Sequence, residues 1–248
     1  MHKKPGCSDY SRLVKQKHLT NIFETHCSIV KAITNKHAWA PKQYLYIDAN
    51  AGPGEIDDYI GSPINFLQVA KKLDVNYQVL FIEKDNDSFL ALEDRVQPYR
   101  PDDNIHLYHN DHEVILPDPP FIKRESYGLL YSDPNGIKGF PSIKVLNQFI
   151  ERFPYIDILL HCGCTTFKRV DGACSTGIRA NSYLLESKKR RYIREPYTHQ
   201  QWTFIFLTNY GGFDKKFRNI GFYGHNEPRY WEICEKIFYT AEERYNRG

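Results

Sequence analysis

Short apolar runs alternate along the chain with longer stretches of helical periodicity, and this alternation restricts the fold more than any other feature of the sequence. Strands are predicted over residues 43–48, 78–83, 105–109, 127–132, 156–162 and 203–208. Helices are predicted over residues 11–34, 63–72, 87–96, 142–153 and 227–245. Strands that are separated by helices pair in parallel through crossover connections. The sequence therefore predicts an α/β, Rossmann-like fold with a mostly parallel, doubly wound sheet.

The chain is long enough for one substantial core, and a single domain over residues 1–248 is expected. Its 41% hydrophobic and 25% charged residues are typical of a globular protein. Within this domain, residues 11–40 are predicted as an N-terminal helical segment and residues 165–201 as a basic insertion after the fifth strand. No apolar run approaches the roughly 18 residues that cross a bilayer, and no secretory signal is recognisable, so we expect a cytoplasmic location without membrane contact.

The loop after the first predicted strand carries the first candidate binding residues. It reads Asp48-Ala-Asn-Ala-Gly-Pro-Gly54, in which Gly52 and Gly54 would let a ligand approach the backbone. Pro53 removes one amide from any phosphate cradle, which argues against a dinucleotide and favours a nucleoside without phosphates. A simple turn is the alternative interpretation of this segment.

Polar residues also follow the second and third predicted strands. Glu83 ends the second strand, where a carboxylate can accept hydrogen bonds from both hydroxyls of a ribose. Asn110 and Asp111 follow the third strand, where a carboxylate and a backbone amide can contact an adenine edge. A helix-capping acid is the alternative for Glu83, and a surface turn is the alternative for Asn110 and Asp111.

The segment after the fourth predicted strand supplies a candidate transfer site. It reads Tyr131-Ser-Asp-Pro-Asn-Gly136, so Asp133, Pro134 and Asn135 would project acceptors into the same crevice. A carboxylate and a backbone carbonyl at this place can hold the two hydrogens of an amine and direct its lone pair at a methyl sulfonium. A type I turn is the alternative.

A basic run within the predicted insertion indicates contact with nucleic acid. Its cationic residues are Lys188, Lys189, Arg190, Arg191 and Arg194. Tyrosines and a tryptophan are interleaved with them, and this combination is suited to contact the phosphates and stack on the bases of DNA or RNA. A solvated helix end is the alternative.

Histidine and cysteine residues near the fifth predicted strand do not have the spacing of a metal site. The group consists of His161, Cys162, Cys164 and Cys174. It lacks the paired Cys-x-x-Cys spacing of structural zinc, so we expect no metal.

Five segments within about the first 150 residues occur in an order and spacing that resemble a known family. They are Lys17-His18, the segment from Leu45 to Gly54, Gly61-Ser-Pro63, Phe81-Ile-Glu83 and Ser132-Asp-Pro-Asn-Gly136. This pattern resembles the three-Cys-motif partner proteins and, more distantly, the adenine-N6 methyltransferases of 23S ribosomal RNA.

The resemblance implies a class I methyltransferase fold with S-adenosylmethionine as cofactor and with transfer to an amino group, of the adenine N6 type, in a nucleic-acid base. It places Asp133 at the transfer site. It places the following residues near the cofactor: His18, Asn50, Ser62, Glu83 and Asp111. The loop and strand positions discussed above add Asp48, Gly52, Gly54 and Asn110 to this set.

The sequence departs from the amino-methyltransferase pattern directly after Asp133. That pattern is Asp-Pro-Pro followed by an aromatic residue that stacks on the target base, whereas Asn135 and Gly136 occupy these places here, with Phe140 as a substitute aromatic. The departure leaves a second hypothesis open. In this alternative the chain is a catalytically inactive partner subunit that keeps the cofactor fold and binds nucleic acid or a separate enzyme.

Overall fold

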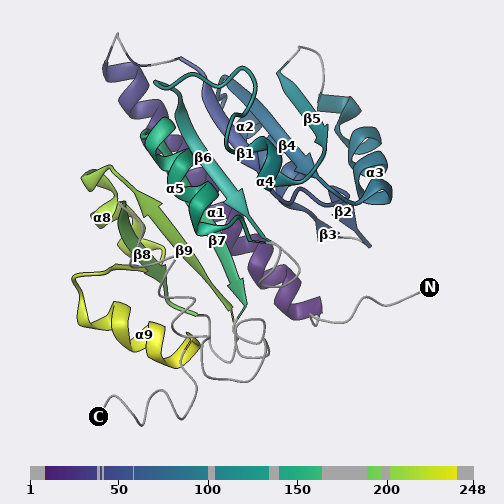
Figure 1. Cartoon of the computed structure of the whole chain (residues 1–248). Coiled ribbons are helices and arrows are strands. Elements are labelled where there is room, and N and C mark those ends of the chain that lie inside the picture. The colour runs from purple at the N-terminus through teal and green to yellow at the C-terminus, as the bar shows by residue number, and fades with distance from the viewer. Residues whose placement is uncertain are drawn as a thin grey trace.

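The structure, a computed structural model, describes residues 9–37, 40, 42–57, 59–99, 104–133, 140–163, 189–196 and 202–238. Among these residues the main sheet has eight strands in the order β10-β8-β9-β7-β6-β1-β4-β5 (Figure 1). From the middle of the sheet to one edge lie β1 (Tyr44–Asp48), β4 (Tyr77–Glu83) and β5 (Ile105–His109). From the middle to the other edge lie β6 (Tyr127–Ser132), β7 (Ile156–Gly163), β9 (Trp202–Thr208), β8 (Arg190–Arg194) and β10 (Phe222–Gly224). A separate small sheet pairs β2 (Glu55–Ile56) with β3 (Tyr59–Ile60).

The strand directions place a switch point beside β1. Strands β5, β4, β1, β6 and β7 are parallel, β9 is antiparallel to β7 and β8, and β10 is antiparallel to β8. From β1 the chain adds β4 and β5 on one side and then returns to add β6 and β7 on the other. In sheets of this kind, ligands bind where the strand order reverses. The predicted Rossmann-like α/β fold with a mostly parallel, doubly wound sheet is confirmed.

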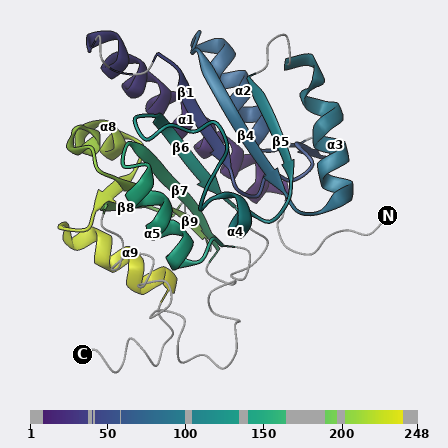
Figure 2. The same ribbon diagram turned by 45° about the horizontal axis from the view of Figure 1, so that its top comes forward.

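Helices cover both faces of the sheet (Figures 1 and 2). The helical elements are α1 (Asp9–Lys36), α2 (Ser62–Lys72), α3 (Asn86–Val96), η1 (Gln97–Tyr99), α4 (His112–Ile115), α5 (Ile143–Arg152), η3 (Gly211–Phe213), α8 (Asp214–Asn219) and α9 (Pro228–Phe238). One hydrophobic core lies between one face of the sheet and helices α5 and α9, and a second lies between the opposite face and helices α1, α2 and α3. Because both faces are covered, β1 and β9 are buried along their whole length, which explains why they consist mainly of apolar residues.

The predicted strands and helices are present with their ends shifted by at most two residues, except for the carboxyl end of the last helix. The described part of that helix ends at Phe238, and residues 239–248 lie outside the described residues. The short elements β2, β3, α4, α8 and β10 were not predicted, because segments of two to six residues carry no clear periodicity.

One strand lies inside the stretch that the sequence predicts as an insertion. Residues 190–194 form β8, which pairs with β9 and β10, so this part of the predicted insertion over residues 165–201 contributes a strand to the main sheet. Residues 164–188 and 197–201 lie outside the described residues. The strand is hard to recognise because three of its five residues are arginines.

Gly128 lies where the central strands β6 and β1 pair, opposite Leu45. A Cβ atom added there would lie 1.8 Å from the carbonyl oxygen of Leu45, so the two strands would have to separate. We expect Gly128→Ala to lower the free energy of unfolding by about 3 kcal/mol, measured by urea denaturation. Glu125→Ala, in the exposed turn before β6, should change it by less than about 0.5 kcal/mol. An equally small change in Gly128→Ala would contradict the close approach of β1 and β6.

Candidate functional site

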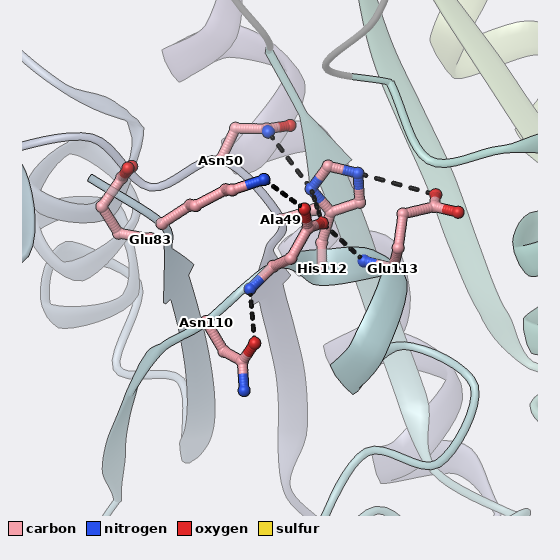
Figure 3. Close-up of a pocket in the computed structure, with 8 residues that line it drawn as sticks. Ala49, Asn50, Glu83, Asn110, His112 and Glu113 are labelled. Carbon is pink, nitrogen blue, oxygen red and sulfur yellow. Dashed lines mark hydrogen bonds and ion pairs between the residues drawn. The ribbon is translucent and has the colours of Figure 1, made fainter. Parts of the chain in front are cut away.

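A pocket of about 160 Å³ opens at the carboxyl ends of β1, β4 and β5, beside the switch point of the sheet (Figure 3). It is lined by Ala49, Asn50, Glu83, Lys84, Asn110, Asp111, His112 and Glu113. The structure thus brings together four residues that the sequence singles out: Asn50, Glu83, Asn110 and Asp111. The other four are not predicted from the sequence, although each directly follows β1 or β4 or lies next to Asp111.

The carboxylate of Glu83 ties the β1 loop to the end of β4. Its Oε2 accepts a hydrogen bond from the backbone N–H of Gly52 at 2.6 Å, and its Oε1 accepts one from the backbone N–H of Asp85 at 2.8 Å. Gly52 has φ of +63°, a left-handed conformation that favours glycine. Glu83 is therefore held in place before any ligand arrives, and it retains unused acceptor capacity because each carboxylate oxygen has two lone pairs.

The second glycine of the loop is fixed by a close backbone approach. Gly54 has φ of +78°, and its carbonyl oxygen accepts a hydrogen bond from the N–H of Gly61 at 2.6 Å. Arg95 donates from its guanidinium to the carbonyl of Pro53 at 2.5 Å. The loop that begins at Asp48 is thus anchored to α3 and to the start of α2, which makes it a rigid wall for a bound group.

Asp111 caps the short helix α4 and forms an ion pair with Lys84, and both residues line the pocket. Its carboxylate accepts from the N–H of Glu113 at 3.0 Å and from the Lys84 ammonium at 2.7 Å. The hydrogen bond from Lys84, followed by that from the Glu113 N–H, lowers the pKa of Asp111. Asn110 accepts from the N–H of Asp111 at 2.7 Å, so its side-chain oxygen faces the backbone.

Asn50 connects the pocket to the end of β6. Its Oδ1 accepts from the hydroxyl of Ser132 at 2.6 Å, and its Nδ2 lies 3.5 Å from Nδ1 of His112. His112 is 8% exposed, and Nε2 of its ring lies 3.7 Å from a Glu113 carboxylate oxygen. The amide of Asn50 therefore joins the end of β6 to the start of α4.

Asp48 is fully buried at the end of β1. Its carboxylate accepts hydrogen bonds from the hydroxyl of Tyr46 at 2.9 Å and from the N–H of Asn50 at 3.2 Å. Burial raises the pKa of Asp48 to about 7, although hydrogen bonds from Ser62, Tyr46 and Asn50 oppose the rise. Ser62, the first residue of α2, is therefore joined to the β1 loop through Asp48.

Asp133 follows β6 and is part of a second charged cluster. Its Oδ2 accepts from the Lys15 ammonium at 2.7 Å, and its Oδ1 lies 2.6 Å from Nδ1 of His161. Burial alone would raise the pKa of Asp133, but the charges and hydrogen bonds of His161 and Lys15 outweigh burial and hold it well below its usual range. No pattern in the sequence points to Lys15, and His161 is named from the sequence only as a possible metal ligand.

The predicted site residues Asp48, Gly52, Gly54, Ser62 and Asp133 are not among the residues that line the pocket. Pro134 and Asn135 lie outside the described residues. His18 does not line the pocket; its Nδ1 accepts from the guanidinium of Arg194 at 2.8 Å. Burial, followed by the charges of Arg194 and Lys17, lowers the pKa of His18 to about 4.

The basic run does not form a continuous surface. Lys189 is 3% exposed and donates to the carbonyl of Pro154 at 2.9 Å, and burial lowers its pKa to about 8. The Arg194 guanidinium donates to the carbonyls of Ile220 and Glu195, each at 3.1 Å. Both cations are buried and bound by backbone oxygens, and contact of Lys189 and Arg194 with nucleic acid stays a prediction. Arg190 is exposed and Arg191 half-buried, whereas Lys188 lies outside the described residues.

The described residues contain no group of three or more histidine, cysteine or acidic side chains placed to hold a metal ion. Cys164 and Cys174 lie outside that part of the chain. None of the helices in it has the length and apolarity needed to span a bilayer.

No family model matches the chain, and no curated protein is similar to it in sequence. The chain resembles the solved structure of a proposed methyltransferase from Streptococcus mutans in complex with SAH. The sequence identity is 9% and the TM-score 0.46, and the match covers 84% of this chain and 98% of that chain. It also resembles a proposed S-adenosylmethionine-dependent methyltransferase from Methanococcus maripaludis, with 11% identity and a TM-score of 0.42; the match covers 84% of this chain and 96% of that chain. For a proposed rRNA methylase from Clostridium thermocellum, the identity is 12% and the TM-score 0.43, and the match covers 69% of this chain and 91% of that chain. The activities named are those of the matched proteins, and the fold of this chain follows from its own strand order and directions.

Proposed function

We propose that this chain is an S-adenosylmethionine-dependent methyltransferase that acts on an amino group of a nucleic-acid base, of the adenine N6 type. The observation that carries the proposal is the relative position of Glu83 and Asp133. Strand β1 pairs with β4 on one side and with β6 on the other, so both acids lie at the carboxyl edge of the sheet, directly beside the β1 loop. If the ribose of a nucleoside binds Glu83, Asp133 would lie on the opposite side of the β1 loop.

The polar groups of the pocket suit S-adenosylmethionine better than a diphosphate cofactor. Glu83 offers acceptors for ribose hydroxyls, and Asn110 and Asp111 offer partners for an adenine edge. Pro53 supplies no amide to a phosphate, and the ammonium of Lys84 is already bonded to Asp111. When bound, this cofactor supplies a methyl group on a positively charged sulfur.

Asp133 would act on the acceptor. Its lowered pKa keeps the carboxylate ionised, so it can only accept hydrogen bonds. An ionised carboxylate beside the acceptor nitrogen would stabilise the positive charge that forms there during transfer. Arg190, at the start of β8, is an exposed residue of the basic run that could contact phosphates.

Two measurements test the proposal. Titration calorimetry should show binding of both S-adenosylmethionine and S-adenosylhomocysteine, and labelled methyl groups should appear on DNA, transfer RNA or ribosomal RNA. Tight binding without transfer to any of these nucleic acids would favour the inactive partner subunit. Absence of cofactor binding would overturn both hypotheses.

Glu83→Ala should weaken binding of S-adenosylhomocysteine by about 10–100-fold, because a hydrogen bond to a charged group contributes about 1.5–3 kcal/mol. The variant also releases the N–H of Gly52, and the two effects act in the same direction. Calorimetry measures the change, and Asp94→Ala, which removes an exposed acid from α3 outside the pocket, is the matched control. Equal affinities in the two variants would mean that the ribose does not bind at Glu83.

A further inference from the structure

Three polar side chains from distant parts of the chain meet at the carboxyl ends of β6 and β7. Ser132 of β6 pairs with Leu160 of β7, which places the next residues, Asp133 and His161, side by side. Nδ1 of His161 lies 2.6 Å from one oxygen of Asp133, and the Lys15 ammonium lies 2.7 Å from the other. The side chains of Asp133 and His161 are 19% and 12% exposed, so the hydrogen bond between them is largely shielded from water.

The charge state of Asp133 determines which nitrogen of His161 carries the proton. His161 and Lys15 keep the pKa of Asp133 well below its usual range against the effect of burial, so the carboxylate is ionised and can only accept. Nδ1 of His161 must therefore be the donor. In the neutral imidazole, Nε2 then carries a free lone pair.

This Nε2 atom is buried and has no hydrogen-bond partner among the described residues. The rings of Trp202 and Phe204 pack around the imidazole, with centroids 5.3 and 5.2 Å from its own. A buried polar atom without a partner is costly and calls for an explanation. A bound group with an N–H aimed at Nε2 would supply the missing partner.

We propose that His161 is the catalytic residue that takes the proton lost by the acceptor nitrogen, and that Asp133 and Lys15 position it. The inference rests on the proposed methyltransferase function. The acceptor lone pair forms the new bond to the methyl carbon, and the carbon–sulfur bond breaks with its electron pair going to sulfur. The proton of the methylated nitrogen moves to Nε2 of His161, and the resulting imidazolium is stabilised by Asp133.

The arrangement adds a positioning role for Asp133 to its proposed electrostatic role at the acceptor. One of its oxygens accepts from Lys15 and the other faces Nδ1 of His161, so the carboxylate can hold the imidazole in the reactive tautomer. Other titratable groups that face Asp133 are Asp48 from β1 and Tyr131 from β6. His18 from α1 contacts the same Trp202 ring as His161.

The first test compares His161→Asn with the unaltered protein in single-turnover methyl transfer at saturating cofactor. An asparagine amide can still donate to Asp133 but cannot take a proton. We expect the rate to fall by about 10²-fold or more. Affinity for S-adenosylhomocysteine should stay within threefold. His37→Asn, directly after α1, is the control and should keep the rate.

Imidazole rescue separates a chemical role from a structural one. Imidazole added to His161→Gly should restore part of the rate, and it should have no effect on His161→Asn. An unchanged rate in His161→Asn, or no rescue of His161→Gly, would overturn the role of His161 while leaving the proposed methyltransferase function intact. Absence of transfer by the unaltered protein on every acceptor would overturn the proposed function and the role of His161 with it.

A second readout does not depend on activity. Nitrogen-15 spectra of histidine-labelled protein with bound S-adenosylhomocysteine should show His161 protonated at Nδ1 and unprotonated at Nε2. The signal is assigned by its absence in His161→Asn. A neutral imidazole protonated at Nε2 would overturn the inference whether or not the protein transfers methyl groups.

Discussion

Asp133→Ala should lower the rate of methyl transfer by about 10²–10⁴-fold while the affinity for S-adenosylhomocysteine stays within a few-fold. The carboxylate is the shared partner of Lys15 and His161, at 2.7 and 2.6 Å. Its removal takes away the acceptor that Lys15 and His161 share and frees the imidazole to adopt the other tautomer. The proposed cofactor contacts at Glu83 and Asp111 lie on β4 and after β5, so they should remain.

The measurement is single-turnover transfer of labelled methyl groups, with calorimetry on the same preparations. Asp118→Ala is the matched control, because its side chain is 77% exposed and makes a surface ion pair with Arg152. Asp133→Asn is a second variant that keeps the size of the side chain and reduces the risk of unfolding. A similar loss of cofactor affinity and of rate in both Asp133 variants would mean that Asp133 belongs to the cofactor site and not to the transfer site.

The positions of the main strands could be predicted because the fold buries both of their faces. Every residue of Trp202–Thr208 is buried, and a strand that is buried on both faces consists mainly of apolar residues. Strand β8 could not be predicted in this way. The charge of Arg194 is compensated by carbonyls of Ile220 and Glu195, and these partners are known only once the chain has folded.

The candidate site also contains residues that could be predicted and residues that could not. Glu83 ends β4, and Asn110 and Asp111 follow β5, so parallel pairing alone brings them to one edge of the sheet, where they line one pocket. Lys15 gives no such signal, because it lies 118 residues from Asp133 and on a helix that precedes the first strand. His161 follows the same rule as Glu83, since it lies near the carboxyl end of β7, and strand position could have identified it.

Asp48→Asn should reduce the loss of stability that the protein shows as the pH rises. The ordinary pKa of an aspartate is 3.8, and burial raises that of Asp48 to about 7 in the folded chain. A raised acid pKa means that the folded state favours the protonated form. The stabilising contribution of Asp48 is therefore complete below pH 3.8 and is lost as the pH rises towards 7, where the full difference corresponds to about 4 kcal/mol.

Urea denaturation at pH 5 and pH 8 measures this effect. About 2–3 kcal/mol of the difference should fall between these two values, so Asp48→Asn should gain stability relative to the unaltered protein by that amount over the same interval. The comparison uses the change with pH and not the absolute stability, because an asparagine also alters the hydrogen bonds to Tyr46 and Asn50. Asp74→Asn, whose side chain is fully exposed, should show no such change between the two pH values. If Asp48→Asn and the unaltered protein lose stability in parallel, the carboxyl group of Asp48 is already ionised at pH 5, and hydrogen bonds from the β1 loop outweigh the effect of burial.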